Sequence, residues 1–294
     1  MFYKLPKKPP MPRLKIISPV LLLLFLAFVS CKNKQPYKSP VGYDINKPEK
    51  LVMKNSLREI SGIAFIPGKE EVLYAIEDEA GKLFSITPGS DQLSHSKFAK
   101  KGDYEDVTIL NDSTVAVLKS NGSFYLFSIN EIGKEKMDGV KEYEKILPEG
   151  EYEGLSADST KLIALCKNCP GDKEKKEVSV YTMQPGSGDS LIVTNTIKID
   201  ITLIQPTDES SKEKFHPSGI AKNPITHEWY IISSVNKLLL ILDEQWKAKE
   251  YYPLDPSLFK QPEGITFNSK GDLYISNEGG DGDANILIFR YKKK

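Results

Sequence analysis

The chain has 294 residues, a length that suits one large domain or two small ones. Its 10% aromatic and 27% charged content is that of a globular protein, not of a disordered or low-complexity chain. Residues 1–30 hold five basic residues and no acidic one, so the remainder carries a net charge of −5 although the whole chain is neutral. This mildly acidic body argues against nucleic acid as a partner, because phosphate binding requires a basic face.

The N-terminal segment, residues 1–30, has the pattern of a targeting signal. Basic residues precede the apolar run VLLLLFLAFV, Val20 to Val29, which is too short for a comfortable membrane span and has the length of a signal-peptide core. Ser30-Cys31 follows, and a small residue before a cysteine resembles the bacterial lipobox, although Phe28 stands where leucine is usual. We expect Cys31 to be acylated and to hold the mature chain on a lipid bilayer, with the body facing the periplasm of the cell envelope. An ordinary signal peptide or an uncleaved anchor is the alternative.

Residues 31–50 are polar, contain proline and show no hydrophobic period, which is typical of a tether. The 19 residues after Cys31 would reach about 60 Å if fully extended. The folded domain is therefore expected to comprise residues 51–294.

A motif of similar sequence recurs five times along this domain. The first apolar runs of the copies are ISGIAF at Ile60, YEDVTI at Tyr104, YEGLSA at Tyr152, PSGIAK at Pro217 and PEGITF at Pro262. Two further short runs rich in Val, Ile, Tyr and Phe follow each of them, separated by turn-forming residues. This is the signature of strands and hairpins, and the body shows no convincing helical period.

Three or four short strands about every 45 residues predict an all-β fold, specifically a β-propeller with five blades. The interval of 65 residues between the third and fourth copies leaves six blades open, and a two-sheet sandwich is the main alternative. The last copy lacks an outer strand. We expect the N-terminal run Leu51 to Leu57 to supply that strand and close the ring, because closure removes two exposed edges.

The segments LREISGIAF, DYEDVTI, EYEGLS, HPSGIA and QPEGITF…GDLYISNEG resemble the SdiA-regulated family of bacterial β-propeller proteins. The resemblance covers about residues 51–292, nearly the whole domain. It implies the propeller fold but brings no established chemistry, so a function has to be argued from the residues.

Acidic and polar residues recur where the first strand of a copy begins and the second ends, positions that share one face because the strands are antiparallel. The residues predicted to meet around the central axis are Glu105, Glu153 and Glu263 from first-strand starts, with Glu77 and Asn277 from second-strand ends. Carboxylates this close must raise one another's pKa, pair with cations or bind a metal. Oxygen ligands without His or Cys suit Ca²⁺. The alternative is that each glutamate caps a backbone amide or pairs with a basic side chain.

Other motifs are weaker. CKNC, Cys166 to Cys169, lacks two further ligands for zinc, so a local disulfide is the better interpretation. His216 begins a first strand and is either a base or ligand at the axis or a hydrogen-bonded structural residue.

The sequence thus predicts a lipid-anchored periplasmic propeller that binds an unidentified small molecule or protein through an acidic mouth loaded with calcium. A metal-dependent hydrolase with lactonase- or phosphoesterase-like chemistry is the alternative, because an axial ion can polarise a carbonyl and activate water.

Overall fold

The computed structural model describes residues 1–3, 35–90, 92–173, 176–204 and 214–293, so Cys31 lies outside the described residues. The chain divides into two units, Met1–Pro36 and Tyr37–Lys294. The described residues of the first unit, at its two ends, have no regular secondary structure. No helix in the described ranges is both long and apolar enough to cross a membrane.

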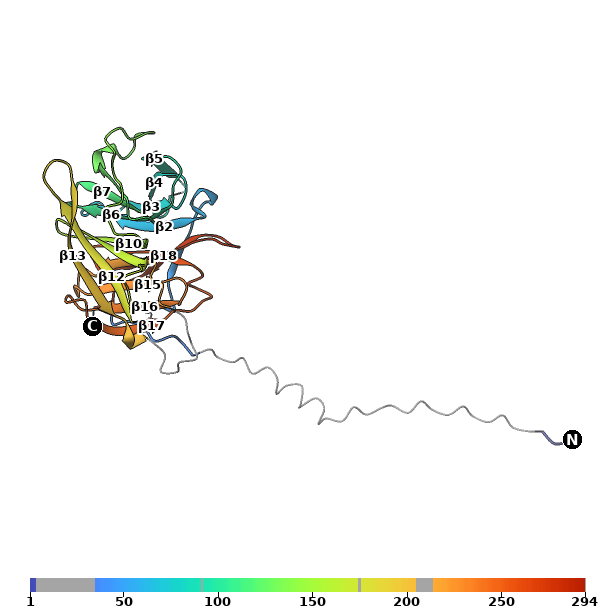
Figure 1. Cartoon of the computed structure of the whole chain (residues 1–294). Coiled ribbons are helices and arrows are strands. Elements are labelled where there is room, and N and C mark those ends of the chain that lie inside the picture. Colours follow the sequence, from blue (N-terminus) through green and yellow to red (C-terminus); the bar gives the residue numbers. More distant parts are fainter. Residues whose placement is uncertain (4–34, 91, 174–175, 205–213, 294) are drawn as a thin grey trace. The chain divides into compact units, whose positions relative to one another are not determined.

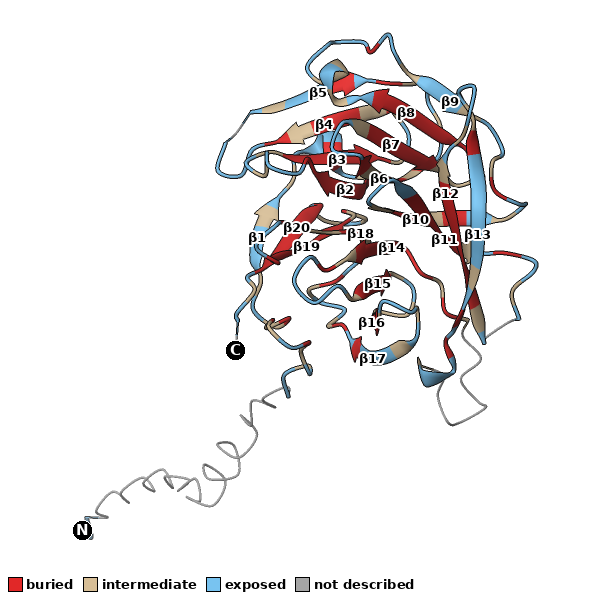
Figure 2. Cartoon of the chain, turned by 90° about the vertical axis from the view of Figure 1, so that its left-hand side faces the viewer, coloured by how far each residue is buried: buried red, intermediate tan, exposed pale blue. Residues whose placement is uncertain are grey.

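The second unit is a five-bladed β-propeller, as the repeat predicts, and each blade is a four-stranded antiparallel sheet (Figures 1 and 2). The strands of blades 1 and 2 are β2 (Ile60–Phe65), β3 (Leu73–Glu77), β4 (Lys82–Ile86), β5 (Leu93–Lys97), β6 (Tyr104–Leu110), β7 (Thr114–Lys119), β8 (Phe124–Ser128) and β9 (Lys141–Tyr143). Those of blades 3 and 4 are β10 (Glu151–Asp158), β11 (Lys161–Asn168), β12 (Glu177–Pro185), β13 (Leu191–Asp200), β14 (Gly219–Lys222), β15 (Trp229–Ser233), β16 (Leu238–Leu242) and β17 (Ala248–Pro253). Blade 5 contains β18 (Pro262–Phe267), β19 (Leu273–Asn277), β20 (Asn285–Phe289) and β1 (Glu49–Val52).

The first strand of each blade lies innermost, and each of these strands contacts its counterparts in the two neighbouring blades, from β2 through β6, β10, β14 and β18 back to β2. The helical elements of the described chain are three 3-10 turns, η1 (Asn55–Leu57), η2 (Ile129–Glu131) and η3 (Thr202–Ile204). The long interval between the third and fourth repeats contains the extended strands β12 and β13 rather than a sixth sheet among the described residues. The buried side chains form clusters between adjacent blades, whereas the outer strands are largely exposed (Figure 2).

The N-terminal strand closes the ring as predicted, because β1 pairs antiparallel with β20 and completes blade 5. The strand begins earlier than expected, at Glu49, and residues 55–57 form η1 instead of extending it. Leu57 is completely buried, so this part of the predicted strand contributes to the core as a turn.

The folded body also begins earlier than the predicted boundary at residue 51. Tyr43 and Ile45 are buried, and the Tyr43 hydroxyl donates a hydrogen bond of 2.6 Å to the Gly271 carbonyl while accepting one of 2.9 Å from the Asn223 amide. The second half of the predicted tether is therefore part of the core. The polar composition of the segment did not indicate this, because the two buried side chains of Tyr43 and Ile45 are enough to anchor it to the core.

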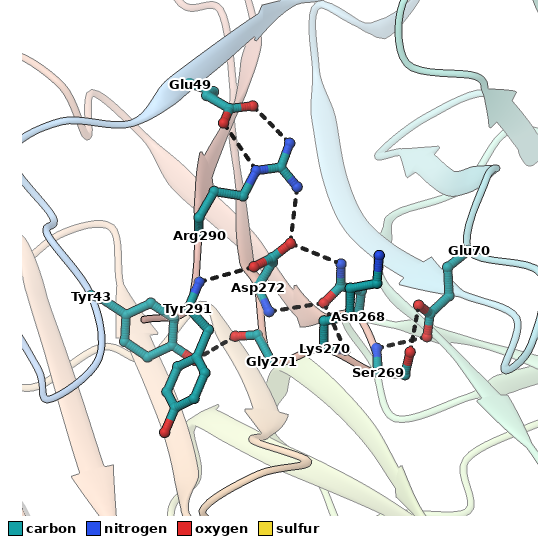
Figure 3. Close-up of polar contacts among 10 residues, drawn as sticks. All are labelled: Tyr43, Glu49, Glu70, Asn268, Ser269, Lys270, Gly271, Asp272, Arg290 and Tyr291. Atoms are coloured by element: carbon teal, nitrogen blue, oxygen red, sulfur yellow. Dashed lines mark hydrogen bonds and ion pairs between the residues drawn. The ribbon is translucent and has the colours of Figure 1, made fainter. Parts of the chain in front are cut away.

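A bridge of charged groups holds the closing strand in place (Figure 3). Arg290 donates to both carboxylate oxygens of Glu49, at 2.9 and 2.7 Å, and to Asp272 at 2.9 Å. Asp272 also accepts the backbone N–H of Tyr291 at 2.9 Å. Hydrogen bonds to Tyr291 and Arg290 outweigh the effect of burial and lower the pKa of Asp272. The first and last strands are thus joined by side chains as well as by the backbone.

Candidate functional site

The glutamates predicted to surround the axis lie at β-bulges of the innermost strands. The register of β6 with β7 skips Glu105, and that of β10 with β11 skips Glu153. In β18 the irregularity spans Glu263 and Gly264. A bulge inserts a residue that has no partner in the ladder and re-aims its side chain. The bulges therefore explain how glutamates in otherwise buried strands reach the central opening.

Glu105, Glu153 and Glu263 line one pocket of about 300 Å³, which we call the mouth pocket. Three other carboxylates share its wall, those of Asp78, Asp103 and Glu278. The remaining lining residues are Ser61, Lys167, His216, Ser218, Ser234, Val235 and Gln261. Six acidic side chains thus face a single lysine, so the pocket has an excess of negative charge when its carboxylates are ionised.

Burial in the mouth pocket raises the pKa of its three first-strand glutamates. Burial, followed by the charge of Glu153, raises the pKa of Glu105 to about 8. The same two causes raise the pKa of Glu263 to about 7, although hydrogen bonding to Ser234 opposes the shift. Burial also raises the pKa of Glu153 itself, against the opposing effect of Lys167. The pKa values of Glu105 and Glu263 therefore lie near neutral pH, in contrast to those of surface glutamates.

Lys167 is the internal counter-ion of the mouth pocket, and the sequence analysis missed it. Its ammonium group forms an ion pair with Glu153. Burial by itself would lower the pKa of Lys167, but the hydrogen bond to Glu153 and the charges of Glu105 and Glu263 outweigh it and raise the pKa. Lys167 immediately precedes Asn168 at the end of β11. A basic residue near the end of a predicted second strand was the signal that could have identified it.

A second group of carboxyls extends the mouth pocket towards blades 1 and 5. Burial, and then a hydrogen bond with Glu59, raise the pKa of Glu278 to about 8. The side-chain amide of Gln261 donates a hydrogen bond of 2.9 Å from its Nε2 to Oε2 of Glu278. Burial and the neighbouring acid Glu77 raise the pKa of Asp78 to about 6. Oδ1 of Asp78 is buried and accepts no hydrogen bond from the described residues.

Two of the five residues predicted as metal ligands lie outside the mouth pocket. Glu77 accepts the backbone N–H groups of Glu79, at 3.3 Å, and Ala80, and therefore caps the turn after β3. Asn277 is fully buried, and its amide donates to Asn285 at 3.3 Å within blade 5. The predicted ring is thus reduced to its three first-strand glutamates, because the second-strand ends satisfy local backbone and side-chain groups instead.

The mouth carboxylates are not pre-assembled around one point. The one trio of His, Cys, Asp or Glu side chains in the described chain whose ligand atoms lie within 4.8 Å of one another is Cys166, Cys169 and Asp172. A disulfide joins these two cysteines, and Asp172 pairs with Lys198 and Ser179. The atoms of this trio that could bind a metal are therefore already engaged. The mouth carboxylates of the described chain therefore do not form a preassembled metal site.

Comparisons with known proteins agree with this architecture. A family model described as SdiA-regulated matches residues 40–280. Among solved structures, a luciferin-regenerating enzyme is similar with a TM-score of 0.50 at 10% identity, over 82% of this chain and 95% of that one. The structure of U3-55K has a TM-score of 0.49 at 9% identity, over 83% of this chain and all of the other. At 10% identity, the likeness to the luciferin-regenerating enzyme shows the fold alone. The search of curated proteins found no match.

Proposed function

The chain belongs to the SdiA-regulated family, and we propose that its propeller is a binding module that takes up a cationic ligand, with calcium as the candidate, in the mouth pocket. The observation that carries this proposal is the imbalance of charge in the pocket, where six carboxyl groups and one lysine surround about 300 Å³. Burial is the main cause of the raised pKa of Glu105 and Glu263, and an incoming cation would relieve the repulsion from Glu153 that adds to it.

The chemistry of the donors favours a hard cation. Carboxylate oxygens in a flexible arrangement suit Ca²⁺, which accepts six to eight oxygen ligands in variable geometry. Glu105 and Glu263 are the first ligands to be expected, because Glu153 is already paired with Lys167. Asp78 contributes a buried oxygen that accepts no hydrogen bond from the described residues, so a bound cation would also satisfy this atom.

Thermal unfolding tests the proposal directly. Calcium at a hundredfold excess over its dissociation constant should stabilise the wild-type domain by about 2.7 kcal/mol relative to the same protein in chelator. The double variant Glu105→Gln/Glu263→Gln should lose this gain, since neutral amides bind hard cations less well than carboxylates. Glu144→Gln is the matched control, because Glu144 is an exposed glutamate outside the mouth pocket and should leave the response intact.

The result of the melting experiment has clear consequences. A wild-type melting temperature that is the same in chelator and in millimolar calcium would exclude calcium as the ligand. A polyamine such as spermidine, used as a second probe, would then decide whether the pocket takes an organic cation. If neither probe shifts the transition, the charge imbalance has no binding role.

A metal-dependent hydrolase is the second candidate, and the position of His216 favours it. This residue lines the mouth pocket together with the glutamates, so an imidazole and carboxylates border the same volume. A base beside a bound cation is the arrangement that activates water. A panel of lactones and phosphoesters, assayed with calcium and with chelator, tests this alternative: chelator-sensitive turnover that His216→Ala abolishes would establish it. No turnover in either condition favours the binding module.

We further propose that Cys31 carries the lipid that holds the module on the periplasmic side of a membrane. The support is the short apolar run and the lipobox-like Ser30-Cys31. Acyl chains contribute about 0.8 kcal/mol for each buried methylene, so several chains on one cysteine hold the protein firmly.

A further inference from the structure

A second pocket lies at the opposite end of the blades from the mouth pocket, between blades 3 and 4. Its volume is about 330 Å³. It is formed where β10 and β14 end and where β15 begins, whereas the mouth pocket is formed where β10 begins. We call it the tryptophan groove, and its residues are Asp158, Lys161, Ile163, Thr182, Gln184, Thr194, Asn195, Ile197, Lys222, Trp229, Glu244 and Trp246.

The groove contains both tryptophans of the chain. Their rings are stacked, with 4.5 Å between the centroids and an angle of 16° between the planes. Trp229 is 2% exposed and belongs to the core of blade 4, while Trp246 is partly exposed above it. The groove therefore has a rigid aromatic wall, supported from below by the core and accessible on the side of Trp246.

Trp246 has an unusual backbone conformation. Its φ is +66°, in the left-handed region that bulky residues rarely adopt. The side chain of Asp243 supports the turn by accepting the backbone N–H groups of Gln245, at 3.0 Å, and Lys247, at 2.9 Å. A glycine would fit this turn without strain. The turn itself does not require an indole; Trp246 packs on Trp229 and the core cluster beneath it, and its partly exposed side also borders the groove.

The rest of the groove is polar but electrically balanced. Two acidic residues face two lysines, and one pair, Asp158 and Lys222, is bonded at 2.9 Å. The side-chain amides of Gln184 and Asn195 face the groove, and neither forms a side-chain hydrogen bond within the described part of the chain. The groove thus differs from the mouth pocket in having no excess charge and in offering amide and hydroxyl groups around an aromatic wall.

We propose that the tryptophan groove binds a neutral saccharide. A sugar ring has an apolar face of C–H groups, which packs on an indole whose π face is electron-rich. Its rim of hydroxyls both donates and accepts hydrogen bonds, which amides such as Gln184 and Asn195 match and a purely apolar ligand would not. The volume is at the lower end of the range for small-molecule sites, suited to one or two sugar rings. The absence of net charge in the groove favours an uncharged ligand.

Intrinsic fluorescence tests the proposal, because both tryptophans of the chain lie in the groove and no other indole contributes. The full-length protein would be titrated with chitotriose, maltotriose and cellotriose up to about 20 mM, a range that covers the millimolar affinities expected of a small neutral ligand. A saturable change in intensity or wavelength with at least one of the three is the expected result. No change with any of them would overturn the proposal.

Variants of Gln184 and Asn195, which we call the polar rim of the groove, separate binding from folding. Asn195 is exposed and Gln184 is partly exposed, so Gln184→Ala/Asn195→Ala should keep the melting temperature while weakening sugar binding at least tenfold. Glu144→Gln is the control, because Glu144 is exposed and lies outside both pockets, and this variant should bind the sugar as the wild type does. Equal affinity of the rim variant and the wild type would refute the assignment. So would a fluorescence change that adenosine or a neutral tripeptide produces and the three sugars do not.

Discussion

Glu105→Gln is the most informative change at the mouth pocket, because it removes one charge without changing the shape of the side chain. In the folded protein burial and the charge of Glu153 raise the pKa of Glu105 to about 8, compared with an ordinary value of 4.5. A raised pKa means that the folded state prefers the protonated carboxyl. The resulting stability is fully present below about pH 4.5 and is lost as the pH rises through about 8.

The size of the effect follows from these two values. The unfolded chain ionises Glu105 above about pH 4.5, whereas the folded state keeps it protonated until about pH 8, so this group should reduce the stability of the folded state by about 3 kcal/mol at pH 7 but by only about 1 kcal/mol at pH 5. Glutamine does not titrate, so the variant should be more stable than the wild type by about 3 kcal/mol at pH 7, and this advantage should shrink to about 1 kcal/mol at pH 5. Groups with lowered pKa, such as Asp272, lose their contribution at more acidic pH and are common to both proteins, so they cancel in the difference.

Urea unfolding at pH 5 and pH 7, with chelator present throughout, measures the two free energies of unfolding. The exposed Glu144→Gln is again the control and should show no pH-dependent difference from the wild type. A variant that is less stable than the wild type at both values of pH would show that the carboxylate makes a stabilising contact. An advantage that is independent of pH would also refute the reasoning, since it could not arise from ionisation.

Three further predictions concern the N-terminal part of the chain. Cys31→Ala should release the protein from the membrane fraction, and equal retention on immunoblots of fractionated cells would contradict the anchor. Deleting residues 32–36 should leave the melting temperature nearly unchanged, whereas deleting residues 32–48 should lower it clearly, because that deletion removes buried side chains; similar melting temperatures would argue against this boundary. Tyr43→Phe should cost about 1–3 kcal/mol in denaturant unfolding, since it leaves a buried carbonyl and amide without their partner; an unchanged free energy would contradict the anchoring role of the hydroxyl.

The sequence was sufficient to predict the number of blades and the ring closure because the inner three strands of each blade are buried. Buried strands require apolar runs such as those of β3 and β16, and runs of this kind recur in each blade. The outermost strands carry no such signal. β9 and β17 consist mostly of exposed polar residues and were not located, because half-exposed strands at the rim need few apolar side chains.

The candidate site was only partly predictable, since it depends on the phase of the bulges. Periodicity in the sequence identifies a strand, but a bulge shifts every later side chain to the other face. Glu105, Glu153 and Glu263 all lie near the starts of first strands, so their positions in the sequence were enough to predict that they meet. The sequence does not show the local hydrogen-bond partners of Glu77 and Asn277, and these two residues were therefore assigned to the mouth. The tryptophan groove was not predicted, because it combines strand residues of blade 3 with residues of blade 4 that are distant from them in sequence, such as Asp158 and Trp246.

The neighbouring residues Glu105 and Asp106 illustrate how one bulge separates two roles. Asp106 is buried and accepts the backbone N–H groups of Val107, at 2.8 Å, and of Leu155 in the next blade, at 2.6 Å. It therefore joins blades 2 and 3, and Gly62 on the other side leaves room for it, because a side-chain carbon there would lie 2.2 Å from its Oδ1. Glu105 accepts no backbone N–H within the described ranges and lines the mouth pocket. Two adjacent acids with almost the same chemistry thus differ in their surroundings, because the bulge directs one into the seam between blades and the other into the mouth pocket.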